Sequence, residues 1–132
     1  MVIKELIKAI LPMIIIEKLK QIKVCVLTKS LQEAVCEQGL RKLYFELSEI
    51  VPDIKNQYSA FVLDSLFKET KVRGQHAFQI SLVQKSIEIS DLLKKKDPVC
   101  VDIGDSAGTH IQYIKSLFGD MRTLSVNLDE EL

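Results

Sequence analysis

The feature that most constrains the fold of this chain is the stretch from Val99 to Asp129, VCVDIGDSAGTHIQYIKSLFGDMRTLSVNLD. It opens with a short apolar, β-branched run and passes through a loop of small residues. From Thr109 to Phe118 the apolar residues then recur at helical spacing. After a stop at Gly119, residues 124–128 alternate apolar and polar side chains, as a strand does. We therefore predict a β–loop–α–loop–β unit whose two strands are parallel neighbours.

The N-terminal part of the chain has a helical pattern. Apolar residues at helical spacing begin at Ile3, and we expect Pro12 to interrupt or restart that helix. Ser30 is followed three residues later by Glu33, which is the spacing of a capping box. A further helix is therefore predicted to begin near Ser30 and to run to about Ile50.

Two more helices are predicted between residues 56 and 96. The first includes the segment 58–67, and Gly74 is expected to separate it from the second. The chain is thus divided into a helical region, residues 1–96, and the start of an α/β domain, residues 97–132. The predicted fold class is α/β, with a helical N-terminal region followed by the first β-α-β unit of an incomplete Rossmann-like sheet.

The charge and cysteine patterns restrict the class of protein. The net charge is zero, but residues 1–30 carry six Lys and two Glu (+4), and residues 97–132 carry two basic and seven acidic residues (−5). A balanced chain gives no indication of nucleic-acid binding. The cysteines are odd in number and widely spaced, which is typical of reduced thiols: Cys25, Cys36 and Cys100. We therefore expect a cytoplasmic protein without a disulfide framework and without a metal site.

The first helix has two interpretations. Its apolar face and its lysines are typical of a helix that lies on a membrane surface, at residues 2–16. The same pattern fits a helix packed on its own domain or on a partner, including an oligomer partner. We favour packing, because Glu5 and Glu17 share the polar face and no Trp anchors the helix.

The loop between the predicted strand and helix, residues 102–109, is suited to bind a ligand. Gly104 and Gly108 remove side chains where the strand turns sharply into the helix, and Ser106 and Ala107 keep the surface low. A ligand can therefore approach the backbone N–H groups of the helix N-terminus. Ligands of open α/β sheets bind at this place, beyond the carboxyl ends of the strands.

The residues of this loop do not match two phosphate-binding motifs. A P-loop needs Gly-Lys-Ser/Thr, whereas Gly108 is followed by threonine and histidine. A dinucleotide-binding loop needs G-x-G-x-x-G, whereas Gly104 and Gly108 are four residues apart. Asp102 and Asp105 would also place two carboxylates beside a pyrophosphate. The loop is better suited to a ligand with positive charge, such as the sulfonium and amino groups of S-adenosylmethionine.

The segment VCVDIGDSAGTH resembles the first motif of the class I S-adenosylmethionine-dependent methyltransferases. In that family an apolar strand is followed by Asp-x-Gly and a small-residue loop, and the next strand ends in an acid that binds the ribose. The resemblance implies that Asp102 and the loop hold the methionine part of the cofactor, and that Asp129 holds the ribose hydroxyls. The implied cofactor-binding residues are Asp102, Gly104, Asp105, Ser106, Gly108 and Asp129.

The resemblance covers only residues 99–129, and it implies that the chain is the N-terminal part of a longer enzyme. Such an enzyme transfers a methyl group directly to an oxygen, nitrogen or carbon nucleophile. The chain alone is then expected to be inactive, because the rest of the sheet and of the site lies outside it. The catalytic residues are not identified.

Two alternatives stay open at this point. One is an NAD-binding or other nucleotide-binding Rossmann-like domain, and the other is a non-catalytic helical interaction module built on residues 1–96. Four further side chains are weaker candidates for ligand contact: Arg73, His76 and Gln79 from the preceding helix, and His110 beside the loop.

Overall fold

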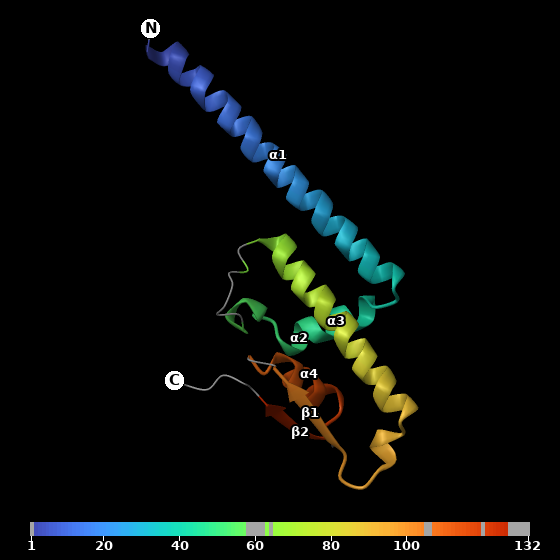
Figure 1. Ribbon diagram of the computed structural model, residues 1–132. Helices are drawn as coiled ribbons and strands as arrows, with labels where there is room; N and C mark the ends of the chain where they lie inside the picture. Colours follow the sequence, from blue (N-terminus) through green and yellow to red (C-terminus); the bar gives the residue numbers. More distant parts are fainter. Residues whose placement is uncertain (1, 58–62, 64, 105–106, 120, 127–132) are drawn as a thin grey trace, which may run out of the picture.

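The computed structural model describes residues 2–57, 63, 65–104, 107–119 and 121–126 (Figure 1). In chain order the elements are α1 (Val2–Glu37), α2 (Arg41–Ile50), a 3-10 helix (Ile54–Gln57), α3 (Leu66–Ile89), a second 3-10 helix (Leu92–Lys94), β1 (Val99–Ile103), α4 (Thr109–Leu117) and β2 (Arg122–Val126). Most of the described chain is helical, and it carries one small parallel sheet. The predicted mixed α/β class is therefore confirmed at this level.

Helix α1 is continuous over 36 residues, and its N-terminal half extends well beyond the rest of the described chain (Figure 1). The predicted interruption at Pro12 is wrong, because α1 continues on both sides of this proline in spite of the hydrogen bond that it removes and the crowding of its ring against the preceding turn. The predicted helix start at Ser30 is also wrong. Thr28 and Val35 are buried on either side of Ser30, so packing on one helix face overrides the local capping signal.

The turn after α1 is centred on Gly39. Its φ of +73° lies in the left-handed region, which glycine adopts without steric penalty. The N–H of Gly39 donates to the carbonyl of Cys36 at 3.0 Å, and the N–H of Leu40 donates to that of Val35 at 3.0 Å. The helix predicted from Ser30 to Ile50 is therefore two helices joined by this turn.

Helix α3 passes through Gly74 without a break, so the predicted separation at that residue is wrong. Gly74 is buried at the contact with α1, where a Cβ atom would lie 3.3 Å from Cγ2 of Val35. The glycine is thus explained by the close approach of two helices. Of the predicted helix over residues 58–67, residues 58–62 and 64 lie outside the described part, and α3 begins only at Leu66.

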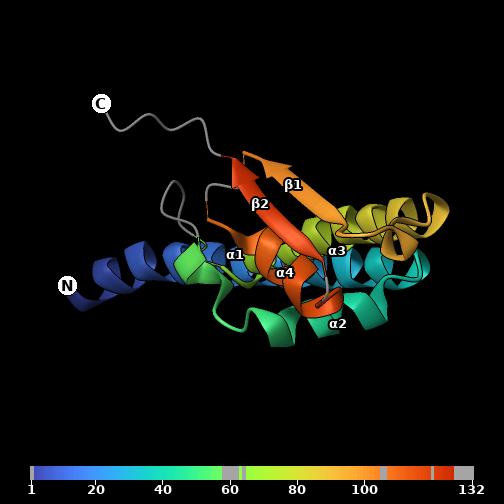
Figure 2. The ribbon, with the colours of Figure 1, turned by 90° about the horizontal axis from the view of Figure 1, so that it is seen from below.

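The two strands are parallel and directly paired, as the sequence predicted. Val99 is opposite Arg122, and Ile103 is opposite Val126. The helices α3 and α4 lie on one side of the sheet (Figure 2). The predicted second strand is shifted towards the N-terminus, since β2 covers residues 122–126 and residues 127–132 lie outside the described part.

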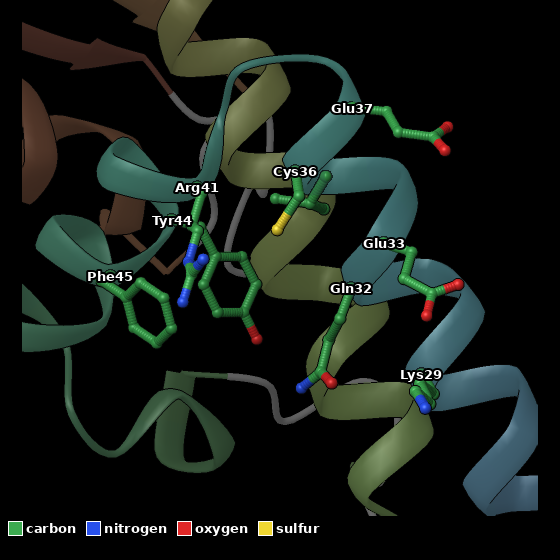
Figure 3. A pocket seen from close by; sticks show the side chains of 9 residues that line it. Lys29, Gln32, Glu33, Cys36, Glu37, Arg41, Tyr44 and Phe45 are labelled. Carbon is green, nitrogen blue, oxygen red and sulfur yellow. The ribbon is translucent and has the colours of Figure 1, made fainter.

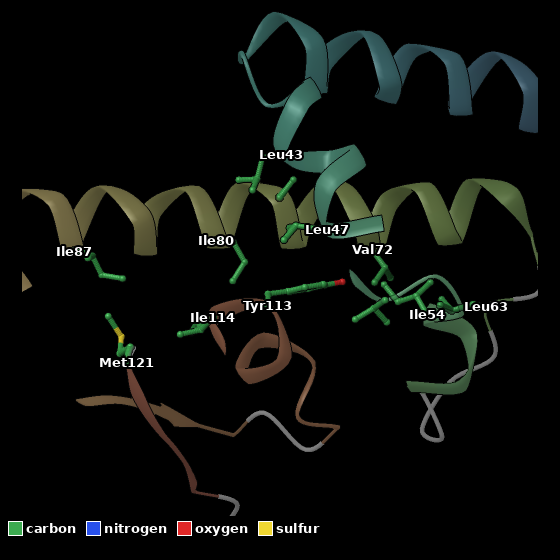
Figure 4. Close-up of a cluster of buried hydrophobic side chains, with 12 residues drawn as sticks. Leu43, Leu47, Ile54, Leu63, Val72, Ile80, Ile87, Tyr113, Ile114 and Met121 are labelled. Carbon is green, nitrogen blue, oxygen red and sulfur yellow. The ribbon is translucent and has the colours of Figure 1, made fainter. Parts of the chain in front are cut away.

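The buried core joins the helical region to the β-α-β unit. Ile80 and Ile87 of α3 point towards Ile114 and Met121, and Tyr113 lies below α3 (Figure 4). Leu43 and Leu47 of α2, Val51, Ile54, Leu63, Val72 and Ala77 complete this cluster of buried apolar side chains. This core fixes α4, and with it Gly108 at the N-terminus of α4, against the middle of α3.

Candidate functional site

Two glycines bound the turn between β1 and α4, Gly104 after the strand and Gly108 before the helix. Gly104 has φ +90° and Gly108, the N-cap of α4, has φ +69°, both in the left-handed region. The N–H of Gly104 donates to the carbonyl of Val126 at 2.8 Å, which ties the turn to the end of β2. A Cβ atom at either glycine would meet nothing within 4 Å. The two glycines are therefore explained by backbone conformation, and the space beside them is open.

Asp102 lies just before this turn, on the covered side of the sheet. Along β1, Cys100 and Asp102 are half-buried, while their neighbours are exposed. The Asp102 carboxylate oxygen Oδ2 is 3.4 Å from Nδ1 of His110, in the first turn of α4. The Asp102 side chain is 20% exposed. It is thus held between β1 and α4, and still reaches solvent.

The structure brings together three of the six predicted cofactor-binding residues. Asp102, Gly104 and Gly108 lie at the carboxyl end of β1 and the N-terminus of α4. Asp105, Ser106 and Asp129 lie outside the described residues.

A group of polar side chains connects this turn to α3. Nε2 of His110 is 3.1 Å from the amide oxygen Oε1 of Gln79, and the rings of His76 and His110 meet edge to face with centroids 5.0 Å apart. Nδ1 of His76 is 3.2 Å from the hydroxyl oxygen of Tyr113. We call these five residues, Asp102, His110, Gln79, His76 and Tyr113, the α3–α4 polar cluster.

Two of the weaker candidates, Gln79 and His110, therefore do lie beside the turn, and His76 lies behind them. His76 is buried, so it contacts Tyr113 and His110 and does not line an open surface. Tyr113 was not identified from the sequence. The only signal was its position three residues after His110, which places both side chains on one side of a helix.

Arg73 has a structural role and does not reach the turn. Its Nη1 and Nη2 donate to the carbonyls of Val51 and Pro52 at 3.0 and 2.8 Å, just after α2 ends. Its Nε donates to Glu69 at 3.1 Å. A buried cation at a helix C-terminus satisfies carbonyl groups that have no partner within the helix.

Further contacts surround the base of the turn. The hydroxyl of Thr109, which is buried at the start of α4, donates to Oε1 of Gln57 at 3.3 Å.

Burial raises the pKa of the Cys100 thiol, and the nearby Asp102 carboxylate raises it further. Cys100 therefore stays a neutral thiol near pH 7.

A separate open cavity of about 490 Å³ lies between α1 and α2 (Figure 3). Its lining includes Lys29 and Glu33 from α1, and Arg41, Tyr44 and Phe45 from α2. Burial raises the pKa of the Tyr44 hydroxyl, and a hydrogen bond with Thr70 opposes that change. None of these residues was predicted as a site, and the lining shows no arrangement typical of catalysis.

Comparisons with family models, with curated proteins and with solved structures find no match to this chain. Among the described residues, no group of three His, Cys, Asp or Glu side chains is arranged to hold a metal ion. No helix in the described part is both long enough and apolar enough to cross a bilayer.

Proposed function

We propose that this chain supplies the first part of an S-adenosylmethionine-binding site in a class I methyltransferase. The observation that carries the proposal is the glycine-bounded turn at the end of β1. Gly104 and Gly108 both have left-handed backbone conformations there, and Asp102 is held at the base of the turn. Such a turn lets a ligand approach the first N–H groups of a helix at the carboxyl end of a parallel strand.

The charge of the turn favours a cationic ligand over a pyrophosphate. Asp102 lies in a half-buried place, and Asp105 follows two residues beyond the strand in the sequence. A negative field in a partly dry place favours the sulfonium and amino groups of S-adenosylmethionine. The α3–α4 polar cluster supports this role, because His110 and its partner Gln79 restrict the Asp102 side chain.

The outer face of the sheet supports a larger Rossmann-like domain. Its apolar side chains are exposed, and no described element covers them: Val99, Val101, Ile103, Leu124 and Val126. Parallel sheets normally have both faces covered. We infer that further strands and helices of a doubly wound sheet complete this face, and that they carry the acceptor site and the catalytic residues. On this proposal the chain alone transfers no methyl group.

The proposal is tested by chemical-shift mapping of the ¹⁵N-labelled chain with S-adenosylhomocysteine and, in parallel, with NAD. We expect S-adenosylhomocysteine to shift the amide signals of Gly104, Gly108 and Thr109, with saturation as its concentration rises. Larger shifts of the same amides with NAD would instead indicate a nucleotide-binding domain. Shifts with neither ligand would contradict the proposal.

One observation favours a second function, a helical interaction module. Helix α1 carries exposed apolar side chains along the part that extends from the body, among them Met13, Leu19 and Ile22. If this were the whole function, Gly108→Ala would leave partner binding unchanged, and S-adenosylhomocysteine would cause no shifts.

A further inference from the structure

One row of exposed apolar side chains runs along α1. Ile15, Leu19, Ile22 and Val26 are 51%, 59%, 59% and 60% exposed. Their spacing of four, three and four residues places them on one side of the helix. It is also the spacing of the two apolar positions in the heptad of a helix–helix seam. We call these four residues the outer stripe.

The side of α1 that packs on α3 is a different one. Thr28 and Val35 are buried there, and Val35 meets α3 at Gly74. Half-buried Val24 continues this packed side four residues before Thr28. Residues two apart in a helix point in nearly opposite directions, and Val24 is two residues from both Ile22 and Val26. The outer stripe therefore faces away from the body of the protein.

The packed side becomes polar where α1 leaves α3. Lys20, four residues before Val24, pairs with Glu17 at 2.8 Å, and both side chains are exposed. The outer stripe stays apolar over the same length. The apolar pattern between Glu17 and Val26 is thus not an extension of the intramolecular contact. Helices derive most of their stability from packing of an apolar face, and no described element packs on this stripe, which points to a contact outside the described residues.

The charges beside the stripe restrict what makes that contact. Lys18 stands three residues after Ile15 and four before Ile22, so it lies along one edge of the stripe. Lys23 stands four residues after Leu19 and three before Val26, along the other edge. Neither lysine pairs with an acidic group among the described residues. An occupant with acidic groups on both edges of an apolar seam would complement this surface.

We propose that the outer stripe binds an amphipathic helix of a partner protein, whose apolar face is flanked by acidic side chains. In heptad terms Lys18 and Lys23 occupy the two positions that flank the seam. A second copy of α1 would bring lysine against lysine in either orientation, which disfavours a homodimer through this stripe. This proposal does not depend on the methyltransferase assignment.

A lipid surface fits the same residues less well. Residues 1–43 contain no Trp, Tyr or Phe to anchor a helix at an interface. Met13, Ile14 and Ile16 widen the exposed apolar surface around Ile15. Between Glu17 and Val26, however, the two lysines confine it to a narrow seam, whereas interfacial helices present a broader apolar face.

The test uses two synthetic helical peptides with the same Leu heptad seam. One carries Glu at both flanking positions, and the other carries Lys there. Fluorescence anisotropy with the full chain should give a dissociation constant at least about tenfold smaller for the Glu peptide. Leu19→Gln with Ile22→Gln should abolish binding. Lys18→Glu with Lys23→Glu should reverse the preference between the two peptides.

Lys20→Glu is the matched control, because it changes the same charge on the opposite side of α1 and should leave the preference unchanged. Circular dichroism verifies that each variant keeps its helix content. Equal binding of both peptides, or binding of neither, would overturn the proposal. So would two other results that depend on Leu19 and Ile22: self-association of the free chain in sedimentation, or binding to phosphatidylserine vesicles with no binding of the Glu peptide.

Discussion

Arg73 illustrates at the residue scale how one side chain fixes the position of neighbouring elements. Its guanidinium group donates to the carbonyls of Val51 and Pro52 and to the Glu69 carboxylate. From the sequence, Arg73 was a weaker candidate for ligand contact, because it lies with His76 and Gln79 in the helix that precedes the β-α-β unit. The carbonyls that it satisfies are 21 and 22 residues away in the chain, so no local pattern indicated them.

We predict that Arg73→Met lowers the free energy of unfolding by about 2–3 kcal/mol, because the buried carbonyl of Val51 and the part-buried carbonyl of Pro52 lose a charged donor. Lys55→Met is the matched control. Lys55 pairs with the same Glu69 carboxylate at 3.5 Å, but its side chain is 57% exposed. Lys55→Met should therefore lower the free energy of unfolding by less than about 0.5 kcal/mol. Urea denaturation measures both values, and equal losses would contradict the structural role of Arg73.

Cys100 gives a prediction that depends on pH. Its pKa is raised by burial and by Asp102, so at a given pH less of it is the reactive thiolate. Cys25 and Cys36 are exposed on α1. We expect iodoacetamide near pH 8 to modify Cys25 and Cys36 before Cys100, as followed by peptide mass spectrometry.

The same reaction in urea is the control, since unfolding removes the burial of Cys100 and should make the three modification rates similar.

The raised pKa of Cys100 also has a consequence for stability. The unfolded chain loses the thiol proton first as the pH rises, so the Cys100 contribution to stability is complete below the unfolded pKa and is lost at alkaline pH. Faster modification of Cys100 than of Cys36 in the folded chain would contradict this account.

At the element scale, the β-α-β unit was predictable because each of its elements has a local signal. The apolar, β-branched run of the first strand, the alternation in the second and the helical spacing after Gly108 do not depend on distant contacts. The N-terminal helices were less predictable. Pro12, Ser30 and Gly74 each carry a local signal for a break, and α1 and α3 continue through all three. The contact between these helices, at Gly74 and Val35, is a tertiary feature without a local pattern.

Substitution of Gly74 tests that contact. We predict that Gly74→Leu lowers the free energy of unfolding by about 1–3 kcal/mol, because the new side chain must separate α1 from α3. The control is Gly119→Leu, at an exposed position where a Cβ atom meets nothing within 4 Å. Thermal unfolding followed by circular dichroism compares the two variants. An unchanged melting temperature for Gly74→Leu would contradict the close packing of the helices.

At the scale of the whole molecule, the sheet is covered on one face only by the described elements. Ile114 on the covered side is 2% exposed, whereas Val101 and Leu124 on the outer face are 50% and 54% exposed. The parallel pairing was predictable from the β-α-β pattern. The sharing of one core between residues 1–96 and residues 97–132 was not, because it depends on where α4 meets α3.

The two faces should differ in their sensitivity to substitution. We predict that Ile114→Ala lowers the free energy of unfolding by about 2–5 kcal/mol. Val101→Thr with Leu124→Thr should change it by less than about 1 kcal/mol, because these opposed side chains are already in solvent and threonine keeps β-propensity. Similar losses in the two variants, measured by urea denaturation, would show that the outer face is covered in solution.

We propose that the turn between β1 and α4 binds S-adenosylmethionine, and Gly108→Ala probes this binding at a single position. Gly108 has φ +69° and open space beside it, so alanine should fit at a cost of about 1 kcal/mol while its methyl group blocks a ligand from the backbone. Amide shifts with S-adenosylhomocysteine are measured for the unsubstituted chain, for Gly108→Ala and for the control Gly119→Ala. We expect saturable shifts around Gly104 in the unsubstituted chain and in Gly119→Ala, and much weaker shifts in Gly108→Ala. Equal shifts in all three proteins, or none in the unsubstituted chain, would contradict it.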